Sequence, residues 1–232
     1  MSEEQKWWWR CAGAGLVTTI ISFYFGMIPN IESCAETGGN LGSIIAFEIV
    51  RAPADVATLF GEEPCRGQFL AAMRHATWVD ALAFIPAYSA FLICGMIALR
   101  SRGPKIAAAG VAAVLLGALF DQIEGVQLFA IMANLPGEQS TIDLLIPMVR
   151  GKFALLSLGA LAIGWLIARI GGVWPVVGLI VTAGGAIMLF GTTNDAQTPL
   201  LGLGGLISWT VLLATAIARI LVLRIGKPTD AG

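Results

Sequence analysis

Six long apolar stretches constrain the fold of this chain more than any other feature of its sequence. A helix needs about 20 mainly apolar residues to cross the hydrocarbon core of a membrane. Backbone polar groups in lipid must be satisfied within the segment, so each stretch is predicted to be a helix. The sequence therefore predicts an all-α, polytopic membrane bundle of about six transmembrane helices. The stretches are Cys11–Pro29, Trp78–Leu99, Ile106–Leu135, Phe153–Ala168, Gly172–Gly191 and Pro199–Leu223.

The composition agrees with a membrane protein and excludes one class of partner. The chain is 57% hydrophobic and 12% charged, whereas soluble domains have about 25% charged residues. A net charge of −1 without a long basic run excludes a nucleic-acid partner. The first apolar stretch follows Lys6 and Arg10 as a secretory signal would, but it is too long and no cleavage site follows. We therefore expect a retained first span, with membrane lipids as its neighbours.

The basic residues predict the orientation, because Lys and Arg accumulate on the cytoplasmic side of a membrane. We expect a multi-pass protein of a cell inner (plasma) membrane with both termini cytoplasmic, namely residues 1–10 and 224–232. The basic residues on the inner side are then Lys6, Arg10, Arg100, Arg102, Lys105, Arg169, Arg219, Arg224 and Lys227, and those on the outer side are Arg51, Arg66, Arg74, Arg150 and Lys152.

Residues 30–77 are predicted to form a helical extracytoplasmic loop, because a structureless connection of this length is uncommon. Leu41–Val50 has the pattern of a short amphipathic helix, and Pro53 suits the first turn of another that Gly61 ends. The segment Gln68–His75 is expected to run directly into the second span. Short apolar helices beside a membrane serve either as a lid or as a structural cap.

The cysteines and the single histidine limit the chemistry. Cys34 and Cys65 bracket the outer loop and would face an oxidising compartment, so a disulfide between them is predicted. His75 is the only histidine, which excludes a His-rich zinc site and a bis-His haem within one chain. We expect neither a metal nor a cofactor.

Two carboxylates interrupt the third apolar stretch, where an acid loses its hydration and is tolerated only beside a partner, a wet cavity or protein interior. Asp121 and Glu124 are three residues apart and share one face of the predicted helix. Residues 78–168 are predicted to hold the polar site. Counting helical rise from each predicted membrane boundary places five charged residues at one depth, near the outer third of the bundle. They are Asp80, Asp121, Glu124, Arg150 and Lys152.

Two interpretations of this cluster stay open. In the functional one, Asp121 and Glu124 form an acid/base pair, with Asp80 and Tyr88 orienting it and Lys152 or Arg150 holding a headgroup. In the structural one, the charges form an ion-pair network that fixes helix register.

The last two spans, within residues 169–223, are rich in small residues that let helices approach closely in lipid. They are predicted to pack within the chain or to form an interface in a homo-oligomer or a larger membrane complex. The glycines are Gly178, Gly184, Gly185, Gly202, Gly204 and Gly205.

The polar segments resemble a group of small bacterial multipass membrane proteins. The resemblance rests on Trp78–Tyr88 with its Asp80, on Gly117–Glu124, and on Lys152–Leu156. In that group an Asp-aromatic segment precedes an Asp-x-x-Glu-Asn helix and a Lys-Phe helix, and Gly125 stands here at the usual Asn. The resemblance implies that four residues belong to one site, namely Asp80, Asp121, Glu124 and Lys152. It implies no activity.

Three functions fit these residues. The first is binding or modification of a lipid-like or isoprenoid-like amphiphile at the outer leaflet, so the chain is either an enzyme or a binding protein. The second is an accessory subunit of a larger membrane complex. The third is a proton- or cation-coupled transporter, which the off-centre acids and the dissimilar halves of the chain disfavour.

Overall fold

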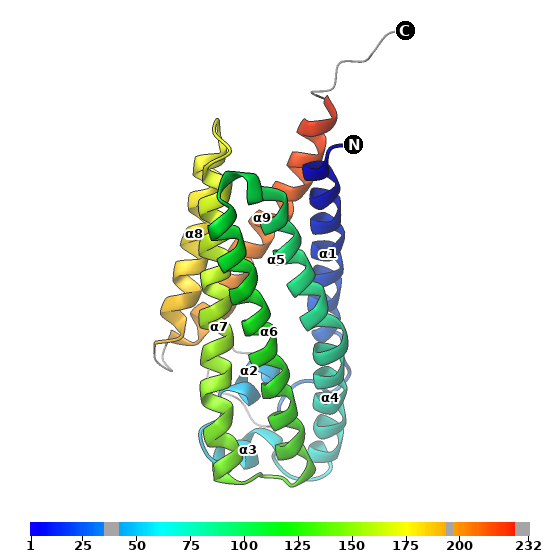
Figure 1. Ribbon diagram of the computed structural model, residues 1–232. Helices are drawn as coiled ribbons and strands as arrows, with labels where there is room; N and C mark the ends of the chain where they lie inside the picture. The colour runs from blue at the N-terminus through cyan, green and yellow to red at the C-terminus, as the bar shows by residue number, and fades with distance from the viewer. Residues whose placement is uncertain (35–41, 194–196, 226–232) are drawn as a thin grey trace. The chain divides into compact units, whose positions relative to one another are not determined.

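The computed structural model describes residues 1–34, 42–193 and 197–225, and within these ranges it contains helices and no strand (Figure 1). The all-α prediction is therefore confirmed. The elements are α1 (Glu3–Phe25), α2 (Ser43–Glu48), α3 (Pro53–Phe60), α4 (Cys65–Val79), the π-helix η1 (Asp80–Phe84), α5 (Ile85–Leu99), the short 3-10 helix η2 (Arg100–Arg102), α6 (Pro104–Ala133), α7 (Gln139–Ala168), α8 (Trp174–Gly191) and α9 (Pro199–Ile225).

Among the described residues, five helical segments are long and apolar enough to cross a membrane. The first runs without interruption through α4, η1, α5 and η2, as expected for a loop segment that continues into the second span. Helix α1 is formed over 23 residues but is less apolar than the other five, because Arg10 and several hydroxyl residues lie along it. A sixth span at α1 remains a prediction. The five segments are Cys65–Arg102, Pro104–Ala133, Gln139–Ala168, Trp174–Gly191 and Pro199–Arg224.

The chain divides into two compact units, which we describe separately. The first unit comprises residues 1–18, 87–115 and 154–232, and the second comprises residues 19–86 and 116–153. Helices α1, α5, α6 and α7 contribute residues to both units.

In the second unit, the predicted helical loop is part of a hydrophobic core. Phe47 of α2 and Phe60 of α3 pack edge to face with ring centroids 5.1 Å apart, and Phe60 also contacts Phe69 of α4. Residues of α6 and α7, including Ile131 and Leu145, complete the same buried cluster. The loop is thus anchored by apolar burial, the dominant favourable term in folding. Helix α2 begins at Ser43, and Leu41 lies outside the described residues, as does the tail from residue 226 onward.

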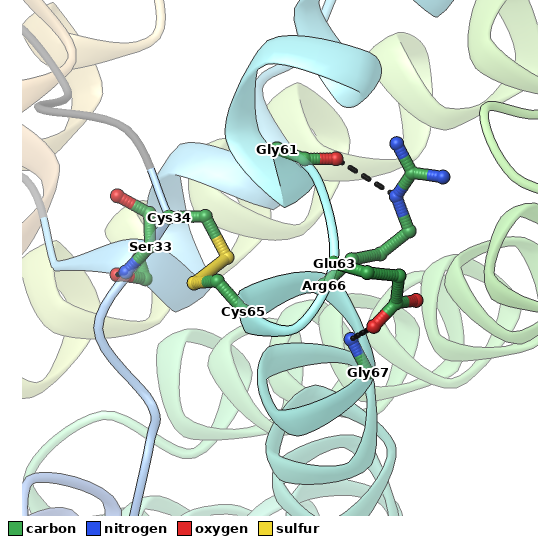
Figure 2. The surroundings of a disulfide bond; sticks show 8 residues. Ser33, Cys34, Gly61, Glu63, Cys65, Arg66 and Gly67 are labelled. Atoms are coloured by element: carbon green, nitrogen blue, oxygen red, sulfur yellow. Dashed lines mark hydrogen bonds between the residues drawn. A yellow bond between two sulfur atoms is a disulfide. The ribbon is translucent and has the colours of Figure 1, made fainter.

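The predicted disulfide between Cys34 and Cys65 is confirmed (Figure 2). It joins the segment before α2 to the first residue of α4, so residues 34–65 form a closed loop. Gly61 has a φ of +59° at the end of α3, a conformation that residues with a Cβ rarely adopt, and a Cβ there would clash with Cys34. Its carbonyl oxygen accepts a 2.8 Å hydrogen bond from Arg66 Nε, which fixes the turn beside the disulfide.

The π-helix η1 follows from a proline in the middle of the span. Pro86 has no N–H, and its ring clashes with the carbonyl four residues earlier in a regular α-helix. The turn before it is widened, so the Ile85 N–H donates to the Asp80 carbonyl instead of the Ala81 carbonyl. The Ala81 oxygen accepts a 2.7 Å hydrogen bond from Gln122 Nε2 on α6. Wide turns of this kind are frequent at functional sites, and this one begins at Asp80.

In the first unit, the glycines of α8 lie against neighbouring backbone. A Cβ at Gly184 would be 2.9 Å from the Gly204 carbonyl oxygen on α9, and a Cβ at Gly178 would be 2.6 Å from the Ala168 backbone nitrogen on α7. Four of the six predicted packing glycines (Gly178, Gly184, Gly185 and Gly204) thus make close intramolecular contacts, whereas a Cβ at Gly202 would meet nothing within 4 Å.

Candidate acid and lysine site

One buried lysine in the second unit is surrounded by three buried carboxylates. Lys152 Nζ of α7 lies 2.7 Å from Glu124 Oε1 and 2.9 Å from Asp121 Oδ1, both on α6. It lies 3.1 Å from Glu48 Oε2, the last residue of α2. The four residues are 2–9% exposed. We call these four residues the acid–lysine site.

Local sequence explains how the two long helices reach this geometry. The spacing of Asp121 and Glu124 places both carboxylates on the α6 face that meets Lys152. Gly151 precedes the lysine, and a Cβ there would overlap the ring of Phe120, so a side chain at this position would push α7 away from α6. On the other side of the lysine, the Phe153 ring centroid lies 5.0 Å from Nζ, an arrangement that attracts a cation.

The charges of the acid–lysine site do not balance. One ammonium faces three carboxylates, so the four groups would carry a net charge of −2 if all were ionised. Burial makes such a charge expensive, and neutralisation by protons is the usual response. Burial raises the pKa of the Glu48 carboxyl above its ordinary value, although the Lys152 charge opposes the shift. The site is therefore arranged to hold protons as well as one lysine.

Glu124 has one bound and one unbound carboxylate oxygen. Oε1 is held by Lys152, whereas Oε2 is buried without a hydrogen-bond partner among the described residues. The same holds for the amide oxygen of Gln127, one turn further along α6. Buried polar atoms in native proteins are nearly always paired, so an unpaired oxygen beside an ammonium calls for a proton or a bound group.

The remaining predicted site residues are distributed differently. Asp80 is half-buried at the start of η1 and interacts electrostatically with Asp121 and Lys152, but its carboxylate forms none of the three ion pairs. Arg150 is exposed. Tyr88 belongs to the first unit, where it is buried and stacks on Trp209 with centroids 5.4 Å apart.

Sequence reasoning missed Glu48, which comes to the site from the outer loop. A signal was present, because Glu48 is an acid between Phe47 and Ile49 in a short apolar helix. An acid in such a helix indicates that it pairs with a cation on another element when the chain is folded. No group of three or more His, Cys, Asp or Glu residues that could hold a metal ion occurs in the described part of the chain.

The five membrane-length helices in the described part of the chain define a multi-pass integral membrane protein. Comparisons with protein-family models, with curated proteins and with solved structures find no match.

Proposed function

We propose that this integral membrane protein binds or modifies a lipid-like or isoprenoid-like amphiphile at the acid–lysine site by carboxylate acid/base chemistry. The observation that carries the proposal is Glu124, with one oxygen 2.7 Å from Lys152 Nζ and the other buried and unpaired. A carboxyl in this state is oriented by its neighbour and retains an oxygen that can give or take a proton. The bacterial inner membrane and cytoplasmic termini belong to the same proposal.

The geometry suggests a role for each member. Glu124 transfers the proton and Asp121 is its partner carboxylate. Lys152 is occupied by three acids, so its role is to hold them together and to set their charge, not to bind an anionic headgroup. Asp80, at the widened turn, orients the pair. Arg150 is exposed and contacts the headgroup phosphate in this proposal.

The net negative charge of the site also favours a second candidate, a proton-coupled transporter. A site with more carboxyls than cations binds protons and releases them when its environment changes. In proteoliposomes, an imposed solute gradient would drive proton movement through a proton-coupled transporter. It would drive none through an amphiphile-binding protein or enzyme.

Native mass spectrometry of the protein in mild detergent tests the leading proposal. We expect an adduct with the mass of an amphiphile on the wild type and on Glu138→Gln, which alters an exposed acid of the second unit. The adduct should be reduced in Asp121→Asn, because the changed carboxyl belongs to the site. A stoichiometric protein partner in place of the adduct would instead favour an accessory subunit, and an adduct unaffected by Asp121→Asn would contradict the proposal.

A further inference from the structure

A second charged cluster lies in the first unit and includes a residue in the first turns of α1. Glu4 of α1 forms ion pairs with two arginines. Its Oε1 lies 2.6 Å from Arg219 Nη2 of α9, and its Oε2 lies 3.9 Å from Arg102 Nη2 of η2. Trp8 Nε1 donates a 3.2 Å hydrogen bond to the same carboxylate. Two guanidinium groups thus share one carboxylate, which leaves a net charge of +1. We call Glu4, Arg102 and Arg219 the arginine cluster.

The cluster has more hydrogen-bond donors than acceptors. Arg219 is only 7% exposed, and its Nε is buried without an acceptor. The Nε of Arg102 is also buried and unpaired, although one of its Nη groups is 3.5 Å from the Arg169 carbonyl oxygen. Leaving a charged donor buried and unpaired costs more than leaving a neutral one. An anion with several oxygens would supply the missing acceptors.

The position of the cluster indicates which anion. Arg102 is the last residue of the span Cys65–Arg102, and Arg219 is close to the end of the span Pro199–Arg224. Trp174, whose ring lies 5.5 Å from the Arg219 guanidinium, is the first residue of α8. Tryptophans and basic residues at span ends lie at the level of lipid headgroups. At that level the common anion is a phosphoryl group, whose oxygens match the planar fork of arginine.

The described residues of the first unit are strongly basic, which supports the same ligand. Their only acids are Glu3 and Glu4. Basic pockets between spanning helices are a known mode of binding anionic headgroups. The basic residues are Lys6, Arg10, Arg100, Arg102, Lys105, Arg169, Arg219 and Arg224.

We propose that Arg102 and Arg219 bind a phosphoryl anion, supplied by an anionic lipid headgroup or by free phosphate, and that this ligand ties α1, η2 and α9 together. The site is separate from the acid–lysine site and does not depend on the function proposed for it. Glu4 has a second role here, because its carboxylate competes with the anion for the two guanidinium groups.

Thermal unfolding of the full chain in a neutral detergent tests the proposal with three additives: phosphatidylglycerol, phosphatidylcholine, and inorganic phosphate against chloride at equal ionic strength. We expect phosphatidylglycerol to raise the unfolding temperature of the wild type by several degrees, and phosphatidylcholine to raise it less. A comparable rise with inorganic phosphate would identify the free phosphoryl group as sufficient, and its absence would identify the lipid as the source.

Variants separate binding from general charge effects. Arg102→Gln should abolish the rise, whereas Arg100→Gln, the same charge loss at an exposed neighbour, should keep it. Without additive, Glu4→Gln should unfold at a lower temperature than the wild type. Its unfolding temperature should reach its maximal rise at a lower additive concentration, because the competing carboxylate is gone. No rise in the wild type with either phosphate source, or an equal rise in Arg102→Gln, would overturn the proposal. Arg102 and Arg219 contact different oxygens of Glu4, so we expect the Arg219–Glu4 pair to persist in Arg102→Gln.

Discussion

At the residue scale, Lys152 decides whether three buried acids are tolerated. Lys152→Met should destabilise the protein near neutral pH by about 3 to 5 kcal/mol, because it leaves carboxylates buried without their cation. The loss should shrink as the pH falls, since a protonated carboxyl needs no counter-charge. Unfolding temperatures across a pH series measure this. Arg150→Met is the matched control, and a loss for Lys152→Met that is equal at every pH would contradict the assignment.

Glu48 gives the site a specific pH dependence. Burial raises the pKa of its carboxyl in the folded protein above the ordinary value of 4.5. As the pH rises above that value, the unfolded chain loses this proton first, so folding stability falls by up to about 1.4 kcal/mol per pH unit until the folded-state pKa is passed. Below the ordinary value both states hold the proton, so Glu48 adds no pH dependence there and the stability is at its highest with respect to this group.

Glu48→Gln should therefore flatten this part of the stability curve and leave the protein as stable as the wild type, or more so, at neutral pH. Lys152 keeps two carboxylate partners in this variant. Chemical unfolding from pH 4 to pH 8 is the measurement, with the exposed Glu138→Gln as control. Parallel curves for wild type and Glu48→Gln would show that Glu48 is not a buried acid of the site.

The different outcomes for Arg150 and Lys152 also belong to the residue scale. Residues two apart on a helix point to nearly opposite sides, so both cations cannot face the same acids. The sequence predicts the same depth for both cations, but the choice between them depends on how α7 is rotated. The contact of Gly151 with Phe120 fixes that rotation.

At the element scale, the helices follow from apolar runs and proline positions, whereas the location of α2 follows from packing. The presence of α2 is predicted by the apolar pattern around Ile44, Ile45 and Phe47, but its bounds are not. The pattern predicts a helix over Leu41–Val50, whereas α2 begins at Ser43 and ends at Glu48. Its placement beside Lys152 depends on a core built from five helices, which no local pattern reports. The proline at position 86 predicts an irregular span, but only the hydrogen bond from Gln122 shows where the freed carbonyl is satisfied.

The contact between α8 and α9 provides a prediction about elements. Gly184→Ala should destabilise the protein by about 1 to 3 kcal/mol, because its Cβ would overlap the α9 backbone and Ser208. Gly202→Ala is the matched control: it meets open space and should be neutral or stabilising by up to about 1 kcal/mol through helix propensity. Thermal unfolding in detergent measures both. If Gly184→Ala has the same unfolding temperature as the wild type, α8 and α9 are not in close backbone contact.

At the scale of the whole molecule, the charge distribution predicts how the chain lies in the membrane. A cysteine introduced at Ser101, in the background Cys11→Ser and Cys94→Ser, should resist a membrane-impermeant maleimide in intact cells and react after the membrane is opened. A cysteine at the exposed Ala57 of α3 should react in intact cells. The reverse pattern of labelling would invert the proposed orientation.

The central claim is that Glu124 works as a proton-transferring carboxyl and does not merely fix helix register. Glu124→Gln leaves Lys152 paired with Asp121 and Glu48, so this variant should purify folded with an unfolding temperature near the wild type. Its pH-dependent retention of the co-purified amphiphile, followed by native mass spectrometry, should be lost, and adding Lys152→Met should not restore it. An unfolded Glu124→Gln protein that Lys152→Met rescues would contradict the account and identify the cluster as a structural network.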